Sequence, residues 1–449
     1  MNRQVVRGGT LVDHRAERRA DLVIEDGAVI HVGDVTSHQG DVIDATGMLV
    51  LPGMVDTHVH LMDPGSTDRE DFPTGTNAAA ARGVTTIIEH THAHAIRTLG
   101  DFADKLAYLK GRANVDFGLA AHVWPESIPG LPELAEAGVS FFKIFTCHTH
   151  GVPGLDSRDL SAALERIGGV GARALIHNED QELTAAAERR LKAEGRVDPA
   201  LLIEWRSREA ETVAVASTAA LVLNSGARVS FAHVSNTDAL DVLDSYRNLG
   251  ATIAAEACPQ YFTLQENELE SMGALRKFTP PARIRSEQDR VSMWQAVTDS
   301  RFAFFSTDHA PSTIVQKTGV EFWDAPFGLP GLDTTLPFLI DAAIRGKLTV
   351  PDVVRLYSTA PAEWYGLPKG RLTPGSDADF VLVDPTSEWV VADSDIISKA
   401  GWSPYSGRTF KGRIVATYLR GTEISMDGVP HDLRSGSFVA PVAQRRRQT

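Results

Sequence analysis

The sequence has little cysteine and nothing that reads as a membrane segment. Among its 449 residues only Cys147 and Cys258 are cysteines. Each lies within an expected strand or just beyond its end, which excludes a disulfide framework. No apolar run is long enough to span a bilayer, and the N-terminus carries no apolar stretch of a secretion signal. We therefore expect a reduced, cytoplasmic setting and no membrane partner.

An excess of positive charge is also missing. The chain has 58 acidic and 44 basic residues, a formal net charge of −14, which argues against binding to nucleic acids or anionic membranes. Its composition, 43% hydrophobic and 23% charged, is that of an ordinary globular protein. The length suits one large barrel plus a smaller domain.

What is present is organised around residues 51–60, which read as a buried strand ending in two histidines. Side chains on a strand alternate between its faces, so His58 and His60 point the same way. Pro52 and Gly53 let the chain change direction into this strand. Two imidazoles at the end of a strand can hold one metal ion. The pair alone is a weak signal, and its weight depends on further ligands elsewhere in the chain.

From about residue 54 onward, apolar strand patterns alternate with helical patterns. Strands are expected up to residue 60 and then at 85–90, 115–123, 140–146, 173–177, 229–233, 251–256 and 302–308. Eight strands alternating with helices imply an α/β fold, a TIM-like (β/α)8 barrel of parallel strands. Such strands are buried on both faces and should be apolar, as these are.

Both ends of the chain show strands with no helices between them. Residues 5–50 contain short strands and a hairpin signal at Glu25-Asp26-Gly27, and strands return after about residue 372. We expect the two termini to join in one small β-sandwich. The expected domains are therefore residues 1–53 and 372–449 for the sandwich and residues 54–371 for the barrel.

Polar side chains gather at the C-terminal ends of the barrel strands, where barrel enzymes place their chemistry. They are His58 and His60 on the first strand, Lys143 on the fourth, His177 on the fifth, His233 on the sixth and Asp308 on the eighth. Four imidazoles and one carboxylate suit two zinc-like ions. A buried lysine beside cations should lose its proton, because desolvation and like charge both lower its pKa. Any one of these residues alone would be an ordinary core residue, and only their joint placement favours a metal site.

Several motifs resemble those of the cyclic amidohydrolases in the amidohydrolase superfamily, the group of allantoinases, hydantoinases, dihydropyrimidinases and dihydroorotases. The resemblance covers nearly the whole chain. It is carried by residues 52–60, Asp63-Pro64-Gly65, Phe142-Lys143-Ile144-Phe145, Glu256-Ala257-Cys258-Pro259-Gln260-Tyr261, 306–311 and 403–407.

The resemblance implies a role for each polar residue at the strand ends. One divalent ion, expected to be zinc, would be held by His58, His60 and Asp308, and a second by His177 and His233. Lys143, carboxylated by CO₂, would bridge the two ions. The ions would activate water and polarise a ring carbonyl, and Asp308 would be the catalytic base that passes the proton to the leaving nitrogen. Family members are commonly tetramers, so a homo-oligomer is expected.

The positions that read the substrate depart from the family pattern. His148 stands where hydantoinases carry a tyrosine that stabilises the oxyanion, and Met62 replaces an arginine of dihydroorotases, which counts against that activity. The motif Cys-Pro-His-Tyr has become Cys-Pro-Gln-Tyr. Additional histidines occur at His90, His92, His94, His122 and His150. We expect substrate contacts from His148, Gln260, Tyr261, His90 and His92. The alternative for each extra histidine, taken singly, is a position on the polar rim of the site, where its ring is solvated or hydrogen-bonded.

The expected function is a metal-dependent hydrolase that opens a cyclic amide, ureide or imide ring of a small molecule, with allantoinase as the nearest activity. A hydantoinase or dihydropyrimidinase activity is the alternative within the enzymes, since Gly328-Leu329-Pro330-Gly331-Leu332-Asp333 resembles that branch. A non-catalytic homologue that serves as a scaffold is the alternative outside them. Ring size and stereochemistry stay open.

Overall fold

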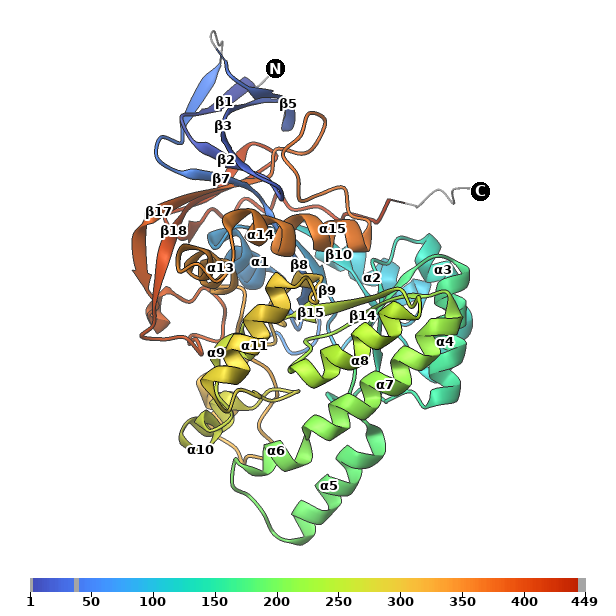
Figure 1. Ribbon diagram of the computed structural model, residues 1–449. Helices are drawn as coiled ribbons and strands as arrows, with labels where there is room; N and C mark the ends of the chain where they lie inside the picture. The colour runs from blue at the N-terminus through green and yellow to red at the C-terminus, as the bar shows by residue number, and fades with distance from the viewer. Residues whose placement is uncertain (1–2, 36–39, 443–449) are drawn as a thin grey trace.

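The computed structural model describes residues 3–35 and 40–442, which form a mixed α/β fold (Figure 1). Its parallel strands pair in chain order within two sheets, β10-β9-β8 and β11-β12-β13-β14-β15-β16. Their bounds are β8 (Met54–Val59), β9 (Val84–Glu89), β10 (Asp116–Leu119), β11 (Ala121–His122), β12 (Phe142–Phe145), β13 (Arg173–His177), β14 (Arg228–Phe231), β15 (Ile253–Ala257) and β16 (Phe304–Phe305). These strands consist almost entirely of buried residues, as expected of parallel strands covered on both faces.

Hydrogen bonds connect the two parallel sheets. The expected strand 115–123 is divided at Ala120, whose backbone N–H donates to Glu89 O (3.0 Å), while Ala121 N–H donates to Phe141 O (3.1 Å). On the other side, Val59 forms a parallel bridge with His309, and His60 N–H donates to His309 O (2.8 Å). The last expected strand, 302–308, is regular only over Phe304–Phe305, and the backbone has a positive φ of 50° at Asp308.

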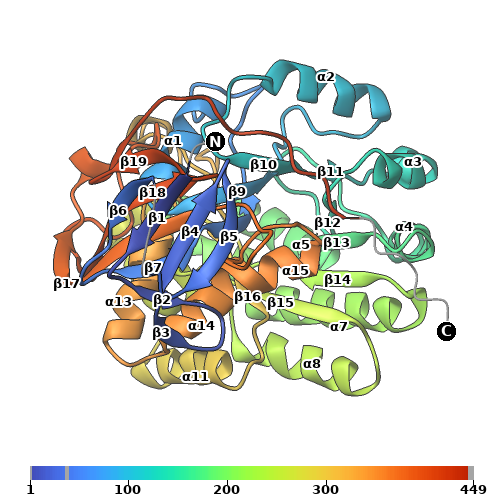
Figure 2. The same cartoon turned by 90° about the horizontal axis from the view of Figure 1, so that it is seen from above.

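Helices surround these strands, as seen from above in Figure 2. Most of the longer ones begin at a side chain that accepts a hydrogen bond from the first helical turn, such as Asp71, Thr98, Asp156, Ser207 and Asn236. The α-helices are α1 (Phe72–Ala81), α2 (Leu99–Leu109), α3 (Leu131–Glu136), α4 (Ser157–Gly169), α5 (Gln181–Ala193), α6 (Leu201–Trp205), α7 (Arg208–Ser225), α8 (Thr237–Asn248), α9 (Gln260–Thr263), α10 (Glu268–Met272), α11 (Glu287–Thr298), α12 (Ile314–Thr318), α13 (Thr335–Ile344), α14 (Val350–Val354) and α15 (Ala360–Tyr365). Short 3₁₀ segments are η1 (Pro125–Gly130), η2 (Gly273–Arg276) and η4 (Asp393–Asp395), and η3 (Arg355–Thr359) is a π-helical turn.

The inside of the parallel strands is filled by a layer of apolar side chains. Every expected barrel strand, or the residue next to it, contributes one member: Val55, Ile88, Ala120, Phe141, Leu175, Ala232, Ala254 and Phe304. Tyr365 at the end of α15 packs against this layer and donates from its hydroxyl to Ser230 Oγ (3.0 Å). Polar groups that project from the strands beyond this layer therefore stand on a closely packed support.

Strands from both ends of the chain share one sheet. Seven strands lie in the order β20-β19-β18-β17-β7-β2-β3, and a second sheet has the order β5-β4-β1-β6. Their bounds are β1 (Arg3–Arg7), β2 (Thr10–Val12), β3 (Glu17–Arg19), β4 (Asp21–Glu25), β5 (Ala28–Gly33), β6 (Asp41–Asp44), β7 (Leu49–Pro52), β17 (Phe380–Val390), β18 (Thr409–Leu419), β19 (Thr422–Met426) and β20 (Val429–Pro430). Blue and red strands therefore lie together in Figure 1. The expected hairpin joins β4 to β5 through Asp26 and Gly27, whose φ angles of 48° and 84° suit a two-residue turn.

Neither cysteine forms a disulfide bond, and both are buried. Within the described residues, no helix combines the length and apolar character needed to cross a bilayer.

Candidate active site

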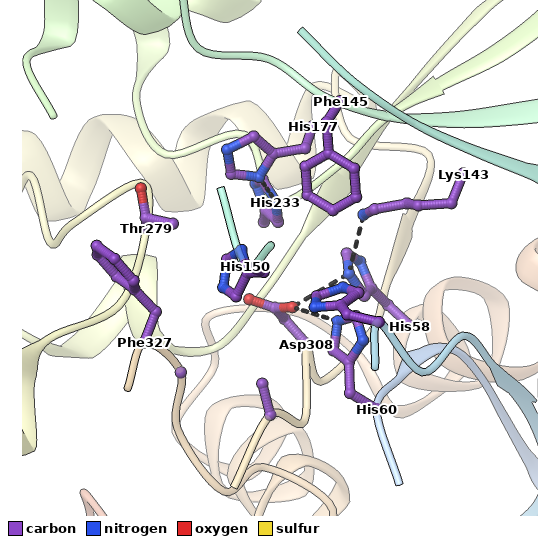
Figure 3. A pocket seen from close by; sticks show the side chains of 13 residues that line it. His58, His60, Lys143, Phe145, His150, His177, His233, Thr279, Asp308 and Phe327 are labelled. Carbon is purple, nitrogen blue, oxygen red and sulfur yellow. Dashed lines mark hydrogen bonds and ion pairs between the residues drawn. The ribbon is translucent and has the colours of Figure 1, made fainter. Parts of the chain in front are cut away.

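The residues predicted at the strand ends meet in one cavity, at the carboxyl ends of the parallel strands (Figure 3). The lining residues are His58, His60, His92, Lys143, Phe145, His150, His177, His233, Thr279, Asp308, Ala310, Phe327 and Gly328. All six residues predicted as metal ligands are among them.

One side of the cavity is formed by the histidines of β8 and the aspartate beyond β16. Asp308 Oδ1 lies 3.1 Å from His58 Nε2 and 3.5 Å from His60 Nε2. The other ring nitrogens are occupied, because His58 Nδ1 lies 2.7 Å from Glu256 Oε1 and His60 Nδ1 lies 2.8 Å from His90 O. Donation of Nδ1–H to these acceptors leaves the Nε2 lone pairs directed at Asp308.

The other side is formed by the histidines after β13 and β14. His177 Nδ1 lies 3.0 Å from His233 Nε2, and His177 Nε2 lies 2.7 Å from Glu179 Oε2. Glu179 is buried and also accepts from Thr279 Oγ1 (2.7 Å) and Arg206 Nη1 (3.2 Å). The pKa of Glu179 is held at about 2, since the Arg206 charge and the hydrogen bond from His177 outweigh the opposing effect of burial. A charged Glu179 orients the His177 lone pair toward His233.

Lys143 on β12 extends into the cavity from a strand of apolar residues. Its Nζ lies 3.3 Å from His58 Nε2 and 5.2 Å from the centroid of the Phe145 ring. Burial lowers the pKa of Lys143 to about 8, although Glu256 and Asp308 oppose this shift. The lowered pKa increases the fraction of neutral amine above that of an exposed lysine, and a neutral amine is a nucleophile.

The donor set of the cavity fits divalent metal ions. Ligands that share one tetrahedral ion at roughly 2.0–2.1 Å are about 3.3 Å apart. The separations between donor atoms run from 3.0 Å for His177 and His233 to 3.5 Å for His60 and Asp308, which bracket this value. Burial lowers the pKa of His58, His177 and His233, which keeps these imidazoles in the neutral form that binds metals.

Backbone hydrogen bonds hold the strand ends at the required places. Asp56 Oδ1 accepts from His58 N–H (3.1 Å) and from Thr307 N–H (3.2 Å), which ties β8 to the segment that carries Asp308. Both Asp308 and His233 have positive φ angles, 50° and 36°, which side-chain-bearing residues rarely adopt. Strained backbone of this kind is concentrated at functional sites because the surrounding structure must maintain it.

His148, a predicted substrate contact, is not among the residues that line the cavity. His148 is exposed and absent from the cavity wall, and its backbone N–H donates to Gln181 Oε1 (2.6 Å). His150 lines the cavity instead. The physical reason is a tight turn in which Thr149 and Val152 bond to each other, with positive φ angles at His150 (55°) and Gly151 (74°). This turn reverses the chain and directs the second histidine inward.

Of the other four predicted substrate contacts, one lines the cavity and three do not. His92 lines the cavity, whereas His90 is buried behind it, with its ring centroid 4.2 Å from that of His60. Gln260 and Tyr261 are buried on α9 and do not line the cavity, and the Tyr261 hydroxyl donates to Pro280 O (2.8 Å). For these two residues the helix directs the side chains into the protein core, so direct substrate contact is not supported.

Several residues of the site were not predicted from the sequence, among them His150, Phe145, Glu179, Glu256, Thr279 and Phe327. Glu256 had a signal, because it ends an expected strand and opens one of the motifs. Glu179 follows His177 by two residues, and this spacing could also have predicted that Glu179 belongs to the site. Thr279 and Phe327 come from long connections, where no periodic pattern predicts the direction of a side chain.

Comparison with known proteins places this chain in a family. The chain is 34% identical over 449 residues to an allantoinase from Rubrobacter xylanophilus, with 98% of each chain covered. It is 32% identical over 453 residues to an allantoinase from Escherichia coli, covering 98% of this chain and 97% of the relative.

Solved structures agree with these relatives. A dihydropyrimidinase from Brevibacillus agri superposes with a TM-score of 0.92 at 27% identity, covering 98% of this chain and 99% of the other. An L-hydantoinase from Arthrobacter aurescens superposes with a TM-score of 0.93 at 28% identity, covering 98% and 100%. The resemblance to cyclic amidohydrolases, enzymes that act on C–N bonds, is thus confirmed. The family described as Amidohydrolase family matches residues 49–424, and the chain belongs to that family.

Proposed function

We propose that this protein hydrolyses a ring C–N bond of a small cyclic amide, ureide or imide, with allantoin as the first substrate to test. One observation carries the proposal. The unoccupied lone pairs of His58, His60 and His177 converge with Asp308 and the Lys143 amine in one cavity, and hydrogen-bonded partners orient each of the three imidazoles. Such an arrangement serves a metal-dependent hydrolase.

The proposed cofactors are two divalent ions, zinc being the expected metal. His58, His60 and Asp308 would hold one and His177 and His233 the other, with Lys143, carboxylated by CO₂, between them. When bound, such ions supply Lewis acidity to an amide carbonyl and lower the pKa of water. Carboxylation converts the amine into an anionic group with two oxygens, which offsets the charge of the paired cations.

The chain's own residues would perform the proton transfer and position the ring. Asp308 Oδ1 lies against His58 and His60, so Oδ2 is the oxygen that accepts a proton from water and delivers it to the leaving nitrogen. His150 reaches the cavity and would donate to the carbonyl oxygen as it gains charge. Phe145 and Phe327 provide apolar walls that pack against a flat ring and exclude water.

A second candidate is a hydantoinase or dihydropyrimidinase activity. It is favoured by the two solved structures, whose names state those activities and whose TM-scores are 0.92 and 0.93. A turnover screen with allantoin, hydantoins, dihydrouracil, dihydroorotate and cyclic imides separates the candidates. The scaffold alternative has less support, because every expected ligand position carries a donor.

The architecture, assembly and location expected from the sequence are part of the same proposal. The ring of pairings through β8 to β16 supports a closed (β/α)8 barrel over residues 54–371, and the sheet shared by β7 and β17 supports a sandwich from residues 1–53 and 372–449. Free, buried cysteines suit a reducing cytoplasm. A homotetramer is proposed by family resemblance, and light scattering on the purified protein tests it.

Metal analysis tests the catalytic proposal directly. Protein purified without added metal should carry about two divalent ions per chain in this site. Chelation should abolish turnover of the substrate found in the screen, and Zn²⁺, Co²⁺ or Mn²⁺ should restore it. Full turnover by metal-free protein would contradict the proposal, and protein that never binds metal would support the scaffold alternative.

The role of Lys143 has its own test. Lys143→Ala should lose metal and turnover together, and short carboxylic acids should rescue part of both by replacing the missing carboxylate. Lys143→Arg should also fail, since a guanidinium remains charged and cannot bind a cation. Lys110→Ala, at an exposed position, is the control. Wild-type metal content and turnover in Lys143→Arg would make Lys143 an ordinary structural cation.

A further inference from the structure

Beside the cavity stand three histidines that the proposed mechanism does not use together. His90 directly follows β9, and His92 comes two residues later. His122 ends β11, which begins two residues after β10, the strand that pairs with β9. The ring of His92 stands edge-on to that of His122, with centroids 5.4 Å apart and planes at 90°. The centroids of His90 and His122 are 6.1 Å apart. The three side chains thus face one common space.

Five of the six ring nitrogens of this histidine triad lack hydrogen-bond partners among the described residues. Both ring nitrogens of His90, both of His122 and Nε2 of His92 are buried without a hydrogen bond to any residue that the structure describes. Buried polar groups are nearly always paired, so five such nitrogens in one place require an explanation. Three histidines of the catalytic cavity, His58, His60 and His177, differ, because Glu256, His90 O and Glu179 each accept from one of their nitrogens. His233 Nδ1 also lacks a partner among the described residues.

One nitrogen of each member lies within 4.8 Å of those of the other two. Three ligands of a tetrahedral zinc ion are about 3.3 Å apart, so small rotations of the side chains would bring the nitrogens to binding distance. The nearest carboxylate on the same strand, that of Glu89, is already engaged by Thr91 Oγ1 and by Lys105 Nζ, the latter at 2.5 Å. The triad is therefore an all-imidazole set, which suits zinc and the later first-row metals rather than magnesium or calcium.

We propose that His90, His92 and His122 bind an additional divalent metal ion of the zinc type, separate from the pair assigned to the catalytic cavity. Three imidazoles leave a fourth position for water or another ligand. Because His92 also lines the catalytic cavity, with its ring centroid 4.4 Å from that of His60 and 4.8 Å from that of His150, the ion borders the space where the substrate would lie. The proposal requires only these three imidazoles and does not depend on the catalytic proposal.

Metal content of matched variants gives the first test. Wild-type protein incubated with Zn²⁺ or Co²⁺ and then desalted should hold about three ions per chain, one in the triad and two in the cavity. His122→Asn and His92→Asn should each lose about one ion per chain and keep the others. The controls His94→Asn and His148→Asn, both at exposed positions, should keep all of them. Unchanged metal content in both triad variants would overturn the proposal.

Anomalous diffraction from wild-type crystals at the zinc edge gives the second test and does not depend on the folding of any variant. The expected result is a peak within roughly 2.0–2.2 Å of a nitrogen of each triad member. Peaks near Asp308 and His233 with none at the triad would overturn this inference and leave the catalytic proposal intact. A peak at the triad alone would support the inference and contradict the catalytic proposal. Density for water alone among the three imidazoles would overturn the metal assignment.

Discussion

At the residue scale, Glu256 contacts a histidine on each side of the cavity, a role that its position in a motif did not predict. This buried carboxylate accepts from His58 Nδ1 (2.7 Å) and, through the same oxygen, from His233 N–H (2.9 Å). It therefore orients one histidine from each side of the cavity.

Replacing this carboxylate should weaken metal binding without removing a ligand. In Glu256→Gln, an amide oxygen can still accept a hydrogen bond, but it carries no charge to polarise the imidazole. We expect metal affinity and turnover to fall by roughly 10- to 100-fold, the usual effect of losing a partner behind a ligand. Competition with a chelator of known affinity measures the first quantity. Glu165→Gln, on the exposed side of α4, is the control, and equal affinities for the two variants would refute the role of Glu256.

His150 and His148 are two residues apart and should behave differently. Losing a donor to the developing oxyanion costs about a hundredfold or more in kcat. His150→Ala should show that loss at unchanged metal content, because His150 lines the cavity and is not one of the proposed ligands. His148→Ala should turn over like the wild type, since its side chain is exposed. Steady-state kinetics on both variants decide the matter, and the reverse pattern would restore the sequence-based assignment.

At the scale of elements, the π-helical turn η3 is hydrogen-bonded to β8 and to the residue before it. β8 is the strand that leads to His58 and His60. The Tyr357 hydroxyl donates to Asp56 Oδ2 (2.7 Å), and Ser358 Oγ donates to Gly53 O (2.7 Å). Asp56 in turn accepts from the backbone of His58 and Thr307. A chain of hydrogen bonds thus runs from η3 through β8 to the segment before Asp308.

Removing one hydroxyl should measure that connection. Tyr357→Phe keeps the ring and leaves the buried Asp56 with one donor fewer, which costs about 1–3 kcal/mol of unfolding free energy. Urea unfolding monitored by circular dichroism measures the loss. Tyr246→Phe, on the partly exposed face of α8, should change stability by less than about 0.5 kcal/mol. If both variants unfold at the same urea concentration, the hydroxyl of Tyr357 contributes nothing to the support of β8.

At the scale of the whole molecule, one lysine joins the terminal strands to the parallel strands. Lys369 Nζ lies 2.6 Å from Asp116 on β10, 2.6 Å from Asp377 and 2.8 Å from Asp379, the last two just before β17. Arg420, in the turn between β18 and β19, also pairs with Asp116. Elements far apart in the sequence are therefore held by one largely buried network.

Lys369→Met should destabilise the whole chain, because it leaves carboxylates buried without their cation. Breaking a buried ion pair from one side costs roughly 3–5 kcal/mol. The same variant combined with Asp379→Asn should recover part of the loss, since one uncompensated charge is then removed. Lys347→Met, at an exposed site, is the control. If Lys369→Met and the control unfold at the same thermal midpoint, Lys369 does not stabilise the contact between the terminal strands and the parallel strands.

The sequence alone determined the order of the strands, the presence of sheets at both ends and the residues that meet at the strand ends. These features depend on local rules, because the side-chain period of a strand and the alternation with helices are visible in a short window. His58, His60 and His177 could be found in this way. The relation of β7 to β17 followed only as the simplest arrangement, and the pairing itself is a long-range contact.

Only the tertiary structure decided which side chains outside the strands reach the cavity. His150 rather than His148 lines it because of a turn with positive φ angles, and α9 directs Gln260 and Tyr261 into the core. The grouping of His90, His92 and His122 depends on how the segment after β9 lies beside β11, where His122 N–H donates to Ile96 O. Loop directions and contacts between distant segments result from packing across the whole molecule, and no periodic signal along the chain encodes them.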